Sequence, residues 1–263
     1  MVSRYLHRPL TISLAAACVG LLALLWIVMR PSPLPEIEVG ITETLNCASF
    51  PSKIWVHRVN TVERAQLLLN EFDGIEIDVV YDPRKQRFDV RHRDIPSIGL
   101  YLVDYFERLD ERRKPLYWVD IKNLNADNQL DQLDRFLALE EKYSLQNRFI
   151  VESPSIELLQ EFTDAGFITS YYLPHIDTRS ASPEEIADWV KKLKAQISDS
   201  RVCAISADYE MYPLLRRYFS DADTLLWTSH RYDRQIDRHE IERIVSANRV
   251  KVLLVQQPTD HYR

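Results

Sequence analysis

Eight short apolar runs alternate with helix-like patterns along the chain, and this repeat constrains the fold more than any other feature. Alternating strands and helices are typical of parallel sheets, in which each strand–helix unit adds one strand. Eight units predict an α/β fold, namely a TIM-like (β/α)8 barrel, and no glycine-rich dinucleotide loop supports an open doubly wound sheet. The runs, rich in β-branched and aromatic residues, are Ile54–Val59, Ile75–Tyr81, Pro115–Lys122, Arg148–Glu152, Phe167–Leu173, Val202–Ser206, Thr224–Thr228 and Lys251–Gln256.

The segments between these runs show the apolar periodicity of helices and residues that are typical of helix N-termini. Residues Asn125–Tyr143 place three leucines at i, i+3 and i+7 with Phe136 alongside, which predicts an amphipathic helix whose stripe could face the sheet; the leucines are Leu130, Leu133 and Leu137. Two helix starts are indicated by a serine followed by proline, because serine caps a helix and proline suits its first position. They are Ser153-Pro154 and Ser182-Pro183.

An uncharged run over Thr11–Met29 is long enough to cross a hydrocarbon layer of about 30 Å as a helix. It ends in bulky residues, whereas a cleaved signal peptide would end in small ones, so we expect an uncleaved anchor over residues 1–30. A lipoprotein box ending at Cys18 is the other alternative, but it lacks a leucine three positions earlier. Arg4 and Arg8 precede the run, which predicts a single-pass protein of the plasma or inner membrane whose main domain faces outward, in the periplasm.

Between this anchor and the first strand lies a proline-containing stretch with little periodicity, residues 31–51, which we interpret as a linker. Residues 52–263 then form the barrel. In an outward domain, Cys47 and Cys203 either pair as a disulfide or remain two buried thiols. The formal net charge of -6 and the lack of a basic stripe argue against a nucleic-acid partner.

Acidic side chains on the second and third predicted strands form a candidate metal site. Glu76 and Asp78 are two residues apart on one strand, so both point to one face, the barrel interior. Converging carboxylates repel each other, and a hard divalent cation relieves that repulsion, so Mg²⁺ or Ca²⁺ is implied. Asp120 and Lys122 share a face in the same way, which gives a third acid for the metal and an ammonium group for a phosphate oxygen.

Two histidines follow strands near these acids. His57 lies near the end of the first strand, and His92 follows a strand-like stretch after the second. An imidazole exchanges protons near neutral pH, as phosphodiester cleavage requires at the attacking and leaving oxygens. The pair is therefore the candidate acid and base.

Taken in order, these motifs resemble the glycerophosphodiester phosphodiesterase family, one of the PLC-like phosphodiesterase TIM barrels. The resemblance implies a metal-dependent phosphodiester hydrolase that acts on small glycerophosphodiesters such as glycerophosphocholine, or on related lipid headgroup esters. It further implies a metal held by Glu76, Asp78 and Asp120, an acid/base pair of His57 and His92, and a phosphate held by Arg58 and Lys122. The motifs are His57-Arg58, Asn60-Thr61, Glu76-x-Asp78-Val79, His92, Asp120-Ile121-Lys122, Glu152-Ser153 and Leu226-Trp227-Thr228, of which Glu152 and Trp227 are expected on the rim.

The chain also departs from that pattern. Val59 stands where the family usually has glycine, one residue is inserted between His92 and Asp94, and Asp120 is one methylene shorter than the usual glutamate. The Trp-x-His-x-x-Asn opening at Trp55 also resembles menorin-type domains of the same superfamily. Three alternatives therefore stay open: a catalytically degenerate membrane-anchored barrel that acts as a binding module, a menorin-like domain, and a lyase that forms a cyclic phosphate.

Overall fold

The computed structural model describes residues 34–37, 45–109, 114–145, 147–228 and 238–256. The chain divides into two units, Met1–Glu36 and Ile37–Arg263, and the architecture below belongs to the second. The predicted anchor over Thr11–Met29 lies outside the described residues. Within them, none of the helices is both long and apolar enough to cross a bilayer.

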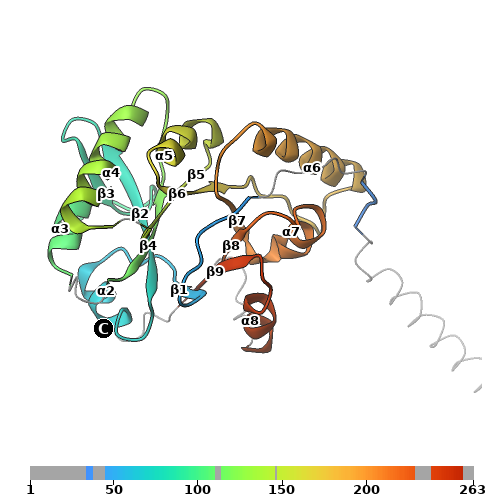
Figure 1. Ribbon diagram of the computed structural model, residues 1–263, viewed down its shortest axis with the longest axis horizontal. Helices are drawn as coiled ribbons and strands as arrows, with labels where there is room; N and C mark the ends of the chain where they lie inside the picture. Colours follow the sequence, from blue (N-terminus) through green and yellow to red (C-terminus); the bar gives the residue numbers. More distant parts are fainter. Residues whose placement is uncertain (1–33, 38–44, 110–113, 146, 229–237, 257–263) are drawn as a thin grey trace, which may run out of the picture. The chain divides into compact units, whose positions relative to one another are not determined.

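Eight parallel strands close into a barrel, as the sequence predicts. Each pairs with its neighbours in the order β1-β2-β4-β5-β6-β7-β8-β9, and β9 pairs again with β1. Figure 1 shows the helices on the outside of these strands. The strands are β1 (Ile54–Val56), β2 (Gly74–Asp82), β4 (Leu116–Ile121), β5 (Phe149–Ser153), β6 (Ile168–Tyr172), β7 (Ala204–Asp208), β8 (Thr224–Trp227) and β9 (Val250–Val255).

The helices follow the strands in a βα sequence, which covers the outer face of the sheet. In the described part of the chain they are α2 (Val62–Leu68), α3 (Leu102–Glu107), α4 (Gln129–Tyr143), α5 (Gln160–Asp164), α6 (Pro183–Ser198), α7 (Tyr212–Tyr218) and α8 (Arg238–Val245), with short 3-10 turns at Ile156–Leu159 and Tyr209–Met211.

An extra strand, β3 (Arg87–Val90), forms an antiparallel hairpin with the end of β2. β2 is long enough to pair with β4 along Gly74–Val79 and then with β3 from Val79 to Asp82. The hairpin therefore extends the carboxyl end of β2 and carries the chain back toward the barrel opening.

The lower half of the barrel interior is apolar. Trp55 from β1, Trp118 from β4 and Leu254 from β9 are fully buried there with other aliphatic side chains. Gly74 makes this packing possible, because a Cβ at this position would lie 2.2 Å from Cδ2 of Trp55. The carboxylates on β2 and β4 lie beyond this apolar layer, toward the carboxyl ends of the strands.

A segment just before the barrel packs against its amino end. The ring of Phe50 packs edge-on against Trp55, with the ring centroids 5.0 Å apart. The backbone N–H of Cys47 donates to a carboxylate oxygen of buried Asp223 at 2.6 Å. The predicted linker over residues 31–51 therefore contains residues that take part in barrel packing. Cys47 and Cys203 are both free and half-buried beside the same core, and burial raises the pKa of Cys47 to about 12.

Three details of the sequence prediction were wrong. The first strand ends at Val56 rather than Val59, because Arg58 adopts a positive φ of 56° that no strand tolerates. The leucine stripe of α4 is not the buried face of the helix. Phe136 is fully buried among other rings, while Leu130 is 65% exposed. Ser153 ends β5 and the helical turn begins only at Ile156.

The other predicted helix start was confirmed. Ser182 caps α6 by accepting a hydrogen bond from the N–H of Glu185, whose carboxylate accepts one from the N–H of Ser182 in return.

Candidate active site

A small cavity of about 70 Å³ opens at the carboxyl ends of the barrel strands. This is the end at which TIM-barrel enzymes place their active sites, because the βα loops converge there. Eight of the nine residues singled out in the sequence line it: His57, Arg58, Glu76, His92, Asp120, Lys122, Glu152 and Trp227. The ninth, Asp78, lies beside Glu76 and Asp120 in one carboxylate cluster.

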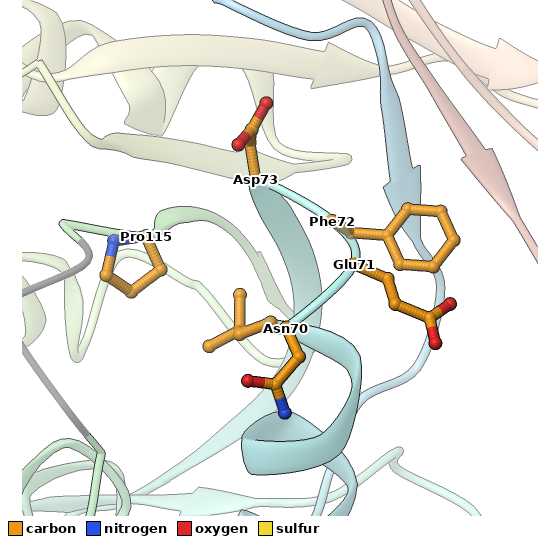
Figure 2. A pocket seen from close by; sticks show the side chains of 6 residues that line it. Asn70, Glu71, Phe72, Asp73 and Pro115 are labelled. Atoms are coloured by element: carbon orange, nitrogen blue, oxygen red, sulfur yellow. The ribbon is translucent and has the colours of Figure 1, made fainter.

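A larger hollow of about 260 Å³ lies at the opposite, amino end of the strands. Figure 2 shows its lining, which comes from the turn after α2 and from Pro115 before β4. Asn70, Glu71 and Asp73 there are exposed to solvent, and no histidine or lysine takes part. Its residues offer no acid/base pair, so the cavity at the carboxyl end is the candidate site.

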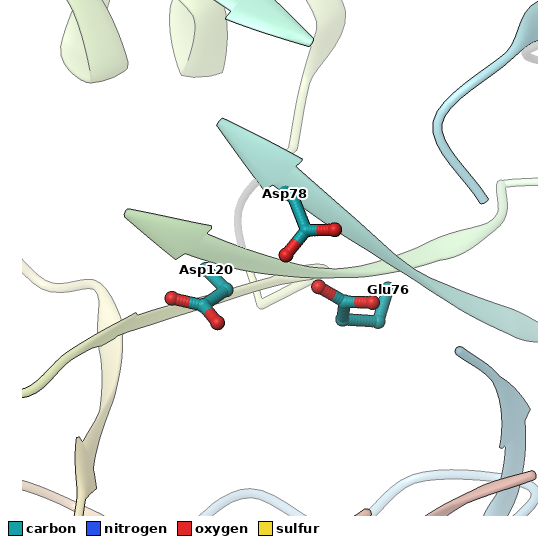
Figure 3. A group of neighbouring side chains, drawn as sticks. All are labelled: Glu76, Asp78 and Asp120. Atoms are coloured by element: carbon teal, nitrogen blue, oxygen red, sulfur yellow. The ribbon is translucent and has the colours of Figure 1, made fainter. Parts of the chain in front are cut away.

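Three buried carboxylates meet in this site (Figure 3). Glu76 and Asp78 come from β2 and Asp120 from β4, where the parallel register sets Asp78 directly beside Asp120. One oxygen from each acid lies within 4.8 Å of the others, and all three residues are buried. The alternation of the strand and the pairing of adjacent strands therefore produce the cluster that the sequence predicted.

Lys122 neutralises part of this cluster. Its Nζ lies 2.7 Å from Oδ1 of Asp78 and also forms an ion pair with Oδ2 of Asp120. Its side chain is 17% exposed, so solvent screens these ion pairs only weakly. The ammonium group is thus bound to two acids in this structure, whereas the sequence predicted a phosphate ligand.

The first βα loop holds the acids in place. Asn60 donates from Nδ2 to Oδ2 of Asp78 at 2.7 Å, and its Oδ1 accepts from the N–H of Asp78 at 2.9 Å. The backbone N–H of Arg58 donates to Oε2 of Glu76 at 2.6 Å. The positive φ of Arg58 accompanies this contact, and its side chain remains exposed at the cavity. A compressed loop therefore orients two of the three acids.

The charges in the site are unbalanced. Burial, with Asp78 nearby, raises the pKa of Glu76 well above its usual range, and burial also raises the pKa of Asp120. Burial opposes ionisation of Asp78 as well, but the ion pair with Lys122 outweighs it and lowers the pKa of Asp78. One ammonium group thus compensates only part of the negative charge that ionised acids would carry here.

A divalent cation fits this donor set. Mg²⁺ and Ca²⁺ prefer carboxylate oxygens, and a second positive charge would remove the cost that raises the pKa values of Glu76 and Asp120. Lys122 is the competing cation, since it already contacts Asp78 and Asp120. A bound ion would therefore share these acids with the ammonium group or displace it.

The position of His57 is fixed by contacts to one of its ring nitrogens, Nδ1. Its Nδ1 lies 3.0 Å from the backbone oxygen of Thr228 and 2.6 Å from Nε2 of Gln256, which itself donates to Thr228. Its Nε2 lies 3.8 Å from Oε2 of Glu76. Burial, with Arg58 nearby, lowers the pKa of His57 to about 3, so the imidazole is neutral at pH 7.

His92 approaches the cavity from the loop after β3. Its side chain is 25% exposed, and its Nδ1 lies 3.4 Å from a carboxylate oxygen of Asp94. The inserted residue between the two therefore still allows a contact between the imidazole and the acid. The two histidines differ in their surroundings. His57 is buried and contacts a backbone oxygen, whereas His92 is partly exposed to solvent.

Glu152 and Trp227, which the sequence predicted at the rim of the barrel, also line the cavity. Burial, with Asp120 nearby, raises the pKa of Glu152 well above its usual range, and its Oε2 has no hydrogen-bond partner among the described residues. Trp227 stacks on Tyr172, with ring centroids 5.6 Å apart and planes within 6°. Glu152 lies deeper than expected, because it is only 2% exposed.

Sequence reasoning missed the roles of Gln256, Thr228 and Tyr172. Gln256 and Thr228 contact His57 only because β1, β9 and β8 are neighbours in the closed barrel. In the sequence, Gln256 is 199 positions from His57 and Thr228 is 171 positions from it. Tyr172 ends the strand before α6 and points into the cavity, as its place in the strand alternation would have indicated.

Comparison with solved structures identifies similar folds. A glycerophosphodiester phosphodiesterase from Parabacteroides distasonis is 14% identical with a TM-score of 0.53, over 80% of this chain and 94% of that one. A putative glycerophosphoryl diester phosphodiesterase from Silicibacter pomeroyi is also 14% identical, with a TM-score of 0.53 over 81% and 91%. An Oleispira antarctica phosphodiesterase in complex with the product sn-glycerol-3-phosphate is 11% identical, with a TM-score of 0.51 over 78% and 92%.

No protein-family model and no curated protein matches the sequence. At these identities the likeness concerns the fold alone, which is similar to the barrel of glycerophosphodiester phosphodiesterases. A shared fold does not fix the chemistry of the site, which depends on the residues that line it.

Proposed function

We propose that this protein is a metal-dependent phosphodiester hydrolase that acts on glycerophosphodiesters or related lipid headgroup esters. One observation carries the proposal: two histidines, a lysine and an arginine surround three buried carboxylates in one cavity at the carboxyl end of a closed barrel. This set contains metal ligands, proton carriers and phosphate ligands together. The folds of the similar phosphodiesterases support the same assignment.

Glu76, Asp78 and Asp120 would hold the cation, Mg²⁺ or Ca²⁺. When bound, it supplies charge stabilisation to the phosphate oxygens as a Lewis acid. Arg58 places its guanidinium group at the exposed mouth of the cavity, where it would bind a phosphate oxygen. Lys122 would serve the phosphate as well, once a cation takes over part of its contact with Asp78 and Asp120.

Proton transfer would fall to the two histidines. The Nδ1 of His57 is engaged by the carbonyl of Thr228, so its Nε2 is the atom free to accept a proton from the attacking group. A phosphodiester anion next to this ring would favour the protonated imidazole and so oppose the burial that lowers the pKa of His57. His92, nearer to solvent, would give a proton to the departing alkoxide.

We also propose that residues 11–29 anchor the chain in the plasma or inner membrane, with the barrel facing outward. The support is the sequence, namely an uncharged run preceded by Arg4 and Arg8. Fusion of a periplasm-dependent reporter enzyme after Gln256 would test the orientation. Reporter activity is expected, and its absence in a stably expressed fusion would contradict an outward domain.

Turnover of a panel of glycerophosphodiesters by the full chain, with Mg²⁺ or Ca²⁺ added, tests the enzymatic proposal. The wild type should release glycerol phosphate, and Glu76→Ala should lose at least about a hundredfold of that activity, because metal charge and geometry are lost together. Glu71→Ala, an exposed acid at the opposite end of the strands, is the matched control and should leave the rate unchanged. No turnover by the wild type, or full turnover by Glu76→Ala, would contradict the proposal.

A second candidate function is a binding module without turnover. The ion pairs of Lys122 with both aspartates favour it, because they partly satisfy the acids without a metal. Phosphodiester binding measured by calorimetry, without hydrolysis across the panel, would support this candidate. Phosphorus NMR of the products separates hydrolysis from a lyase reaction, since only the lyase releases a cyclic phosphate.

A further inference from the structure

The loop that follows His92 exposes two large apolar side chains beside the active site. Every residue from Arg93 to Gly99 is exposed, including Ile95 at 56% and Ile98 at 67%. Among the described residues, Ile98 is the most exposed of the large hydrophobic side chains. Single exposed aliphatic residues are common on protein surfaces, but two on one short loop at a cavity mouth need an explanation.

The loop begins and ends at the candidate active site. At its start, the N–H of Arg91 donates to the backbone oxygen of Asp78 at 3.0 Å, and the next residue, His92, lines the cavity. At its end, the backbone oxygen of Leu100 accepts from the N–H of Val90 at 2.8 Å. The loop that carries Ile95 and Ile98 is therefore attached directly to the strand that bears Glu76 and Asp78.

Internal hydrogen bonds hold the loop in this exposed form. The guanidinium group of Arg91 donates from Nη1 to the backbone oxygens of Arg93 and Ile95, each at 3.0 Å, and from Nε to Asp89 at 2.8 Å. The N–H of Ile95 donates to the oxygen of His92, also at 3.0 Å. The isoleucines are thus displayed by a preorganised turn, which reduces the entropy lost on binding.

We infer that residues 93–99 insert into the surface of a phospholipid bilayer, and that the cavity receives phosphodiester headgroups presented by that bilayer. The substrate half of this inference rests on the proposed function. A narrow loop with two aliphatic side chains can bury them at the fluid acyl boundary. The exposed Arg93 can contact a lipid phosphate, while the neighbouring acid, Asp94, lies beside the imidazole of His92. The proposed anchor at residues 11–29 would hold the loop at the same membrane.

The length of the chain permits this contact. Residues 30–44 separate the anchor from the segment at Leu45 that packs on the barrel. Fifteen residues span at most about 50 Å when extended, which exceeds the height of a strand barrel of this size. The carboxyl end of the barrel can therefore reach the bilayer surface although the chain enters at the other end.

Fluorescence quenching tests insertion without relying on turnover. The full chain is reconstituted in phosphatidylcholine vesicles that contain a nitroxide-labelled lipid, with an environment-sensitive fluorophore on Ser97→Cys and, in a separate sample, on Glu71→Cys. The unsubstituted chain, labelled in parallel, measures the background from its own cysteines. We expect strong quenching at position 97 and little at position 71, and equal quenching at both positions or none at position 97 would overturn the inference.

Activity with two substrates tests the headgroup part. The variant I95S/I98S should cleave a diester held in the vesicle, lysophosphatidylcholine, at least about tenfold more slowly, because the anchored chain loses the apolar contacts that hold the cavity at the bilayer surface. It should cleave water-soluble glycerophosphocholine at the wild-type rate. The matched control L67S/L130S removes two similarly exposed leucines on α2 and α4 and should alter neither rate.

The outcomes separate the two proposals. Equal rates of the I95S/I98S and L67S/L130S variants on the vesicle substrate would overturn bilayer presentation, and so would an equal loss by I95S/I98S on both substrates. If the wild type cleaves neither diester, the proposed hydrolase function fails and the headgroup part fails with it. Quenching at position 97 then still decides whether the loop enters the bilayer.

Discussion

Replacement of Lys122 by methionine removes the one ammonium group that lies between two buried aspartates. Methionine keeps most of the side-chain volume, so the change is mainly electrostatic. The Nζ of Lys122 lies 2.7 Å from Asp78 and also forms an ion pair with Asp120, whose side chain is 10% exposed. Lys122→Met would therefore leave two neighbouring carboxylates without their counter-charge.

The expected loss follows from this burial. Removing one partner of a buried ion pair costs about 3–5 kcal/mol, because the remaining charge is desolvated and uncompensated. Asp120 already has a raised pKa and can take up a proton, which relieves part of the repulsion. We therefore expect the lower end, about 3 kcal/mol, which lowers Tm by roughly 6–12 °C for a domain of this size.

Thermal unfolding followed by circular dichroism measures this loss, with Lys142→Met as the matched control. Lys142 pairs with Glu107 at the same 2.7 Å, but both side chains are about half exposed, so solvent screens the pair and no resolvable change in Tm is expected. Added Mg²⁺ or Ca²⁺ should raise the Tm of Lys122→Met more than that of the wild type. Equal losses in the two variants would refute the electrostatic account of the site.

Three further predictions follow from the same geometry. Phe136→Ala should lower the free energy of unfolding by about 3–5 kcal/mol in chemical denaturation, because it leaves a cavity among four aromatic rings. Asn60→Ala should weaken calorimetric cation binding about tenfold or more by releasing Asp78. Since Glu76 and Asp120 have raised pKa values, protons compete with the cation, so the rise in Tm caused by Mg²⁺ should be larger at about pH 8 than at about pH 5.5.

The barrel could be predicted from sequence because each strand is a compact buried run. Strands buried on both faces become continuous apolar segments, and a polar residue that interrupts such a segment, as Glu76 does, points to the interior of the barrel. Parallel pairing then brings Asp78 and Asp120 together without further assumption. Local sequence and strand register were sufficient for the acids.

Other features depended on backbone conformation or on distant contacts. The positive φ of Arg58 ends β1 early, and nothing in the identity of an arginine indicates it. The buried face of α4 follows Phe136, which contacts the rings of Phe88 in β3, Phe149 in β5 and Phe167 just before β6, rather than the more regular leucine spacing. Gln256 reaches His57 only through closure of the barrel, which a linear pattern does not specify.

The central claim is that the three acids form a divalent-cation site, and a crystal of the protein grown with Mn²⁺ tests it most directly. Anomalous diffraction at the manganese edge should show one strong peak bonded to oxygens of Glu76, Asp78 and Asp120. It should vanish in Glu76→Gln crystals grown in the same way. A wild-type map without a peak among these carboxylates, with Lys122 still bridging Asp78 and Asp120, would contradict the account.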